Sequence, residues 1–144
     1  MADKLHIFAV SDSVGETAEK IAVASVLQFK MERSITRFSR VTKKEQVLKI
    51  IEEAVENDAL IIYTIVIPEL SNFLDEKARE NNVTAVNVMS PLFTAIEAKT
   101  GLKPAYITGL THTMDDQYFN RMKAIEYTIE HDNGQNLETN DDAD

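Results

Sequence analysis

The chain has 144 residues, 44% of them hydrophobic, with no Cys and no Trp, and its 15 basic and 24 acidic side chains give a net charge of −9. This length and apolar content suit one domain with its own core. The lack of Cys excludes disulfides, thiolate metal sites and a cysteine nucleophile, and favours a cytoplasmic protein. The acidic balance argues against nucleic acid as a partner.

Neither a membrane span nor an export signal is expected. The longest apolar run, residues 59–68, is about half the length that a membrane-spanning helix needs. The first residues, Met-Ala-Asp-Lys-Leu-His, lack the charged and apolar regions of a signal peptide.

The first half of the chain predicts two strands, each followed by a helix. The apolar run Leu5–Val10 is typical of a buried strand, and it ends at a polar cluster. From Glu16 to Lys30, small and apolar residues recur at the spacing of one helix face. The segment Ser34–Ser39 predicts the second strand. Thr42-Lys-Lys-Glu45 has the pattern of a capping box, which predicts the start of the second helix.

Two more strand and helix pairs are predicted after residue 59. Leu60–Val66 is apolar on both faces, as in a central parallel strand covered by helices on either side. Pro68 suits the first turn of a helix that we expect to end at Asn81. Val83–Met89 predicts the fourth strand, and Ser90 is the expected N-cap of the fourth helix.

The end of the chain is expected to contain one further helix. Leu102–Thr111 has no regular pattern, whereas apolar residues recur at helical spacing from Thr113 to Ile129. We place the α/β domain at residues 1–134. The segment 135–144 has one larger apolar side chain, so we expect an acidic tail or a truncated connector to a nucleotide-binding domain that is missing here.

Strands that alternate with helices at these spacings predict right-handed crossovers. The expected fold class is therefore α/β with three layers. A mainly parallel sheet of about four strands has helices on both faces, in a doubly wound arrangement.

The turn after the first strand is the leading candidate for a binding site, because ligands of doubly wound sheets bind beyond the carboxyl ends of the strands. Its sequence is Ser-Asp-Ser-Val-Gly-Glu-Thr at residues 11–17. Free N–H groups at the start of the following helix favour an anion, and the hydroxyls of Ser11, Ser13 and Thr17 add donors. Gly15 lets a ligand approach the backbone.

The same turn also has a purely structural interpretation. Ser13 and Glu16 have the spacing of a capping box, and Asp12 is suited to bracing the turn. The turn matches neither of the two well-known phosphate loops. Its two carboxylates oppose an anion unless a metal ion or a nearby Arg compensates.

The other acidic, histidine and basic residues that could form sites are better explained by structural roles. Asp115 and Asp116 beside His112 are better explained as an acidic first helical turn than as a metal site, and no metal is predicted. His6 and His131 are also interpreted as structural. Seven basic residues lie within residues 30–49, and we interpret them as a solvent-exposed surface. The alternative is that they contact a phosphate or an acidic surface of a partner.

Three segments, in this order and spacing, resemble one protein family. They are Ser-Asp-Ser-Val-Gly-Glu-Thr-Ala (11–18), Tyr-Thr-Ile-Val (63–66), and Asp-Gln-Tyr-Phe-Asn-Arg-Met-Lys-Ala-Ile-Glu-Tyr (116–127) followed by Glu-His-Asp-Asn-Gly (130–134). The chain is similar, over nearly its whole length, to the pyruvate, phosphate dikinase regulatory protein family. The two signatures of that family fall on Ser11, Asp12, Ser13, Gly15, Glu16 and Thr17, and on Tyr118, Phe119, Arg121, Ala124, Ile125, Glu126, Asp132 and Gly134.

The resemblance implies a bifunctional enzyme. Its kinase activity uses ADP to phosphorylate a threonine of pyruvate, phosphate dikinase or of the related phosphoenolpyruvate synthase. Its phosphorylase activity removes that phosphate with inorganic phosphate and releases pyrophosphate. The implied residues for phosphate or target binding are those of the first signature, with Arg121 as a charge partner. No catalytic residue is assigned.

This sequence departs from the family pattern in three places. Val14 stands where Thr is common, and Asn133 where Asp is common. The family's nucleotide-binding loop, Gly-Val-Ser-Arg-Thr-Ser-Lys-Thr-Pro, does not occur. Because such a loop holds nucleotide phosphates in line for transfer, we expect ADP or ATP to be bound mainly outside this chain. The 144 residues alone are expected to bind no cofactor and to be inactive.

The alternative is a flavodoxin-like, non-catalytic module that binds phosphate or a phosphorylated cofactor such as FMN at the same turn. Val14 interrupts the spacing of hydroxyl residues that is typical of flavodoxin loops. A receiver domain is excluded, because Ile65-Val66-Ile67 after the third strand offers no phospho-accepting Asp. The oligomeric state stays open, a homodimer included.

Overall fold

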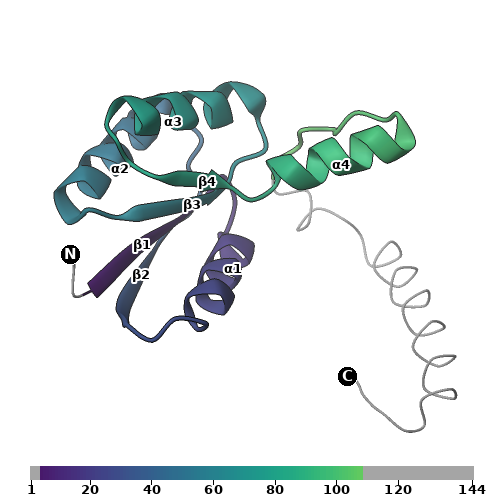
Figure 1. Ribbon diagram of the computed structural model, residues 1–144. Coiled ribbons are helices and arrows are strands. Elements are labelled where there is room, and N and C mark those ends of the chain that lie inside the picture. The colour runs from purple at the N-terminus through teal and green to yellow at the C-terminus, as the bar shows by residue number, and fades with distance from the viewer. Residues whose placement is uncertain (1–3, 109–144) are drawn as a thin grey trace, which may run out of the picture. The chain divides into compact units, whose positions relative to one another are not determined.

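Strands and helices alternate along residues 4–108, the part of the chain that the computed structural model describes (Figure 1). The strands are β1 (Lys4–Ser11), β2 (Glu32–Phe38), β3 (Leu60–Thr64) and β4 (Ala85–Asn87). The helices are α1 (Glu16–Val26), α2 (Lys44–Asn57), α3 (Pro68–Glu80) and α4 (Ser90–Thr100).

The four strands form one sheet in the order β2-β1-β3-β4, and every neighbouring pair is parallel. The chain moves outward from β1 to β2, then crosses back over β1 to β3. Strand order therefore reverses between β1 and β3. In doubly wound sheets this switch point opens a crevice beyond the carboxyl ends of the two strands.

Helices cover both faces of the sheet (Figure 1). On one face, Ala22 and Val26 of α1 pack against Ile7 and Ile62. On the other face, α2 and α3 contribute to a larger core that contains Ile61 and Tyr63 and residues of both helices. Consecutive residues of β3 thus face opposite cores, which explains why this strand is apolar throughout. The predicted three-layer, doubly wound α/β fold is confirmed.

Small residues let α1 approach the sheet. Ala9 of β1, together with Ala18 and Ala22 of α1, has no exposed surface. A larger side chain at any of these positions has no free space in a close-packed interior.

Three elements are shorter than the sequence predicts, and one of them, β3, ends at Thr64 rather than Val66. The helix expected to reach Lys30 ends at Val26, and the following Leu27 and Phe29 are 59% and 66% exposed. With no surface to bury against, these residues do not extend the helix. The fourth strand covers only Ala85–Asn87, because the N–H of Val83 donates instead to Ala78 O at the end of α3, 2.8 Å away.

The predicted helix starts differ in detail. The capping box expected at Thr42 is shifted, since Gln46 Oε1 accepts the N–H groups of Thr42 (2.8 Å) and Lys43 (3.0 Å). The N-cap of α4 is Met89 rather than Ser90, with Asn87 Oδ1 accepting the N–H groups of both. The predicted helix at 113–129 and the domain boundary at 134 lie outside the described residues. Among residues 4–108, no helix is long and apolar enough to cross a membrane.

Candidate functional site

Asp12 lies at the switch point, one residue beyond β1. Its Oδ2 accepts a hydrogen bond from the backbone N–H of Val66, 2.9 Å away, in the loop that follows β3. The same oxygen accepts a longer hydrogen bond of 3.3 Å from Thr108 Oγ1. The side chain is nearly buried, with 5% of the residue exposed. Burial raises the pKa of Asp12, and the hydrogen bond from Val66 partly opposes that shift.

The turn that follows is tied to the loop after β2. Ser11 Oγ accepts the N–H of Ser13 at 2.9 Å, which occupies the buried Ser11 hydroxyl within the turn. The carbonyl oxygens of Ser11 and Ser13 accept the N–H groups of Val41 (2.9 Å) and Arg40 (2.7 Å). Ser11 thus braces the turn, while Ser13 stays half-buried.

Gly15 begins α1 in a conformation that favours glycine. Its φ is +96°, and no side chain caps the helix, so the capping box predicted for Ser13 and Glu16 is wrong. A Cβ on Gly15 would lie 3.1 Å from both Cγ and Cδ of Arg37. Glu16 and Thr17 follow on the exposed side of the first turn.

Arg37 of β2 lies against this turn. Its Nε donates to Glu19 Oε1 at 2.9 Å, its Nη2 pairs with the same oxygen, and its Nη1 donates to Val14 O at 3.3 Å. The charge of Arg37 is thus paired with Glu19, one helical turn beyond Glu16, and its contact with the turn itself is to the Val14 carbonyl. In sequence terms Arg37 is only one of seven clustered basic residues. The parallel pairing of β1 with β2, which sets Ala9 opposite Arg37, brings it to the turn.

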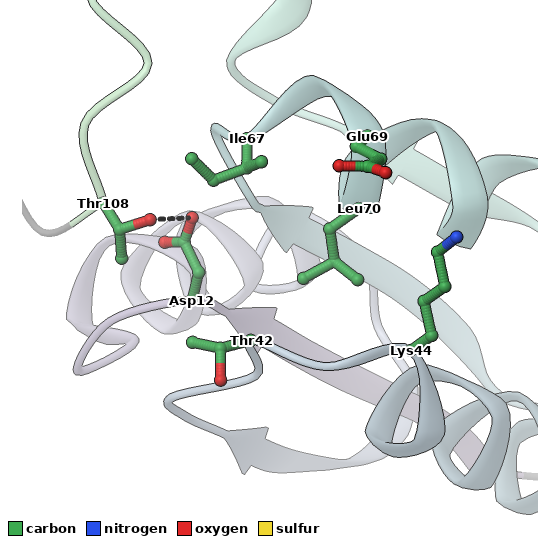
Figure 2. A pocket seen from close by; sticks show the side chains of 7 residues that line it. All are labelled: Asp12, Thr42, Lys44, Ile67, Glu69, Leu70 and Thr108. Carbon is green, nitrogen blue, oxygen red and sulfur yellow. Dashed lines mark hydrogen bonds between the residues drawn. The ribbon is translucent and has the colours of Figure 1, made fainter.

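A cavity of about 230 Å³ opens beside Asp12, over the starts of α2 and α3 (Figure 2). Its polar lining comes from the turn after β1, the loop after β2, the first turns of α2 and α3, and the segment after α4. Asp12 belongs to the first signature and Lys44 to the basic residues of 30–49, whereas the sequence does not mark the other lining residues as a site. The lining residues are Asp12, Thr42, Lys44, Ile67, Glu69, Leu70 and Thr108.

The remaining candidates divide into two groups. His6 Nδ1 lies 2.9 Å from Ser34 Oγ across the β1–β2 pair, in keeping with its structural interpretation. Arg121, the acidic cluster at 115–116 with His112, and His131 lie outside the described residues. Between residues 4 and 108, no three His, Asp or Glu side chains gather as metal ligands.

Comparison with known sequences identifies the family. The sequence profile described as kinase/pyrophosphorylase matches residues 7–144. The chain belongs to the kinase/pyrophosphorylase family. This membership confirms the resemblance that the signature segments indicate.

Curated relatives in this family carry a common name. A pyruvate, phosphate dikinase regulatory protein 1 from Syntrophomonas wolfei is 80% identical over 145 residues, covering 100% of this chain and 52% of the relative. Pyruvate, phosphate dikinase regulatory proteins from Alkaliphilus oremlandii and Halothermothrix orenii are 41% and 39% identical, covering 90% and 99% of this chain and 47% and 52% of the relatives. The chain thus spans about half the length of the curated relatives it matches.

Proposed function

We propose that this chain is the N-terminal domain of a cytoplasmic, bifunctional regulator of pyruvate, phosphate dikinase or phosphoenolpyruvate synthase. The whole enzyme phosphorylates a threonine of its target with ADP and removes that phosphate with inorganic phosphate, releasing pyrophosphate. The family match over residues 7–144 carries the proposal, together with relatives that are named as dikinase regulators.

In this proposal the chain binds the target and a phosphate group at the turn 11–17. The turn lies at the switch point of the sheet, where ligands of this architecture bind. Ser13 and Thr17 supply hydroxyls, and the first N–H groups of α1 have no side-chain cap. Arg37 lies against the turn with its guanidinium paired to Glu19, and Arg121 is the proposed charge partner of the phosphate.

The nucleotide is proposed to be held elsewhere. No Gly-Val-Ser-Arg-Thr-Ser-Lys-Thr-Pro segment occurs in this sequence. Backbone amides and a Lys in such a loop align and neutralise the transferred phosphoryl group, which supplies most of the rate enhancement in this chemistry. The chain by itself is therefore proposed to bind the dikinase without phosphorylating it.

Two measurements on the purified chain test the proposal. Calorimetric titration with the dikinase is expected to show binding, whereas incubation with the dikinase and ADP labelled in its β-phosphate is expected to leave the dikinase unlabelled. The full-length Syntrophomonas wolfei relative serves as the positive control for labelling. Labelling by this chain alone would contradict the placement of the nucleotide. Absence of both binding and labelling, with the relative as well, would contradict the proposed function.

Phosphate binding has a separate readout. Inorganic phosphate is expected to shift the amide resonances of Ser13 and Thr17 in ¹H–¹⁵N spectra, and Thr17→Val is expected to weaken the affinity. Thr36→Val, which removes an exposed hydroxyl on β2, is the matched control. Equal affinity in the two variants would remove Thr17 from the proposed site.

A further inference from the structure

Thr108 places a threonine hydroxyl on the buried carboxylate of Asp12, inside the cavity shown in Figure 2. The distance of 3.3 Å between Thr108 Oγ1 and Asp12 Oδ2 exceeds the range of about 2.5–3.0 Å usual for O–H···O bonds. The N–H of Val66 donates to the same oxygen at 2.9 Å, an ordinary distance. The hydrogen bond from Val66 is thus the structural one, and the weaker bond from Thr108 is replaceable.

The cavity has the size of a side chain. Its volume of about 230 Å³ lies below the range of roughly 300–1,000 Å³ of small-molecule pockets, and corresponds to about eight waters at ~30 Å³ each. The space is small for a nucleotide and large enough for an amino-acid side chain. Ile67 and Leu70 line the cavity and offer an apolar surface to a methyl group.

The charges of the cavity favour an uncharged hydrogen-bond donor. Two carboxylates, Asp12 and Glu69, line it against one ammonium group, that of Lys44. The Lys44 Nζ lies 5.1 Å from the centre of the Phe73 ring, where the aromatic face already stabilises its charge. This balance opposes a phosphate. Burial raises the pKa of Asp12, and each hydrogen-bond donor that reaches its carboxylate opposes that shift by stabilising the charged form.

We propose that this cavity binds the side chain of an unphosphorylated threonine from a partner protein, whose hydroxyl replaces that of Thr108 as the donor to Asp12. The methyl group of the incoming threonine packs against Ile67 and Leu70. Thr108 is the occupant of the site in the absence of the partner. The inference rests on the proposed function, in which the partner is the dikinase and the threonine is the one that becomes phosphorylated.

A double-mutant cycle tests the contact directly. The affinity of the chain for the dikinase is measured by calorimetry with wild-type chain and Asp12→Asn, each against wild-type dikinase and a dikinase whose regulatory threonine is replaced by Val. Asn keeps an oxygen for the N–H of Val66 but loses the charge. The neutral amide oxygen still accepts the threonine hydroxyl, so the variant loses the difference between a charged and a neutral hydrogen bond, about fivefold to tenfold in affinity. Asp12→Asn is therefore expected to weaken binding about fivefold to tenfold for the threonine form and to leave binding of the valine form unchanged.

Thr108→Val gives an independent test that leaves Asp12 intact. Removal of the competing hydroxyl is expected to strengthen binding of the threonine form several-fold, with no change for the valine form. Thr36→Val, exposed on β2, is expected to change neither affinity.

The outcomes separate the two proposals. If wild-type chain binds the dikinase but Asp12→Asn weakens both dikinase forms equally, or neither, the threonine contact is overturned and the proposed function stands. If the dikinase binds neither this chain nor the full-length relative, the proposed function fails and the inference fails with it.

Discussion

The carboxylate of Asp12 and the backbone N–H of Val66, 54 residues apart in the sequence, form a 2.9 Å hydrogen bond that joins the loops after β1 and β3. These two strands are neighbours at the switch point of the sheet. Because Asp12 is only 5% exposed, bulk solvent competes weakly for its hydrogen bond with Val66. The hydrogen bond therefore fixes the geometry of the crevice in which the candidate site lies.

Asp12→Ala is expected to lower the free energy of unfolding by about 1–3 kcal/mol, because it leaves the N–H of Val66 without its acceptor. Asp12→Asn retains an oxygen at this position and is expected to cost clearly less. Urea denaturation of the three proteins, followed by circular dichroism, measures the difference. Equal losses in both variants would show that the hydrogen bond is not the source of the effect.

The titration of Asp12 is expected to contribute to the pH dependence of the free energy of unfolding. Burial raises the pKa of Asp12 in the folded protein above its ordinary value of 3.8, so the folded state holds this proton more tightly than the unfolded state. The contribution of Asp12 to stability is therefore most favourable below pH 3.8 and falls as the pH rises through the folded pKa. Asp12→Asn lacks this titration, so the variant is expected to gain stability relative to wild type as the pH rises. A difference in unfolding free energy that is independent of pH would contradict the raised pKa.

Gly15→Ala is expected to destabilise the protein by about 1–2 kcal/mol from its positive φ alone, and by more because the new Cβ meets Arg37 at 3.1 Å. Gly101→Ala is the matched control, with φ of +73° and no atom within 4 Å of the added Cβ. Thermal denaturation is expected to show the larger loss for Gly15→Ala. Adding Arg37→Ala is expected to reduce that loss, and a lack of rescue would exclude the side-chain contact.

Ala22→Leu is expected to cost about 1–3 kcal/mol, because Ala22 is fully buried between α1 and the sheet. Ala24→Leu adds the same atoms on the exposed side of the same helix and is expected to be nearly neutral. Chemical denaturation compares the two. Similar stabilities would mean that α1 shifts away from the sheet without penalty.

Flavin binding separates the family function from a flavodoxin-like module. The purified chain is expected to be colourless and to leave the fluorescence of added FMN unchanged. Quenching of FMN at micromolar protein would support the flavodoxin-like alternative instead.

The sequence predicted which segments form strands and helices, because apolar runs and helical spacing are set by residues that are close together along the chain. The apolar run at 60–66 and the helix-face spacing after Glu16 both correspond to observed elements, β3 and α1. Their ends were less predictable. Val83 continues an apolar segment in the sequence, yet its N–H completes the end of α3 and the strand begins only at Ala85.

The candidate site was predictable to the extent that it lies on one continuous segment. The turn at 11–17 has a recognisable signature and follows a predicted strand, so the sequence alone predicts its position. The role of Ser11 was not predictable, because its hydroxyl accepts the N–H of Ser13 and is buried rather than offered to a ligand. That distinction depends on the local path of the backbone.

The sequence by itself determined the succession of strands and helices along the chain and the family to which the chain belongs. Both depend on periodicity and signature segments, which are local properties. Tertiary structure alone decided which side chains meet at the first turn. Arg37 reaches Val14 across 23 residues, and Thr108 reaches Asp12 across 96. Such contacts follow from the parallel order of the strands and the crossing of the chain over β1, which bring loops from distant segments to one edge of the sheet.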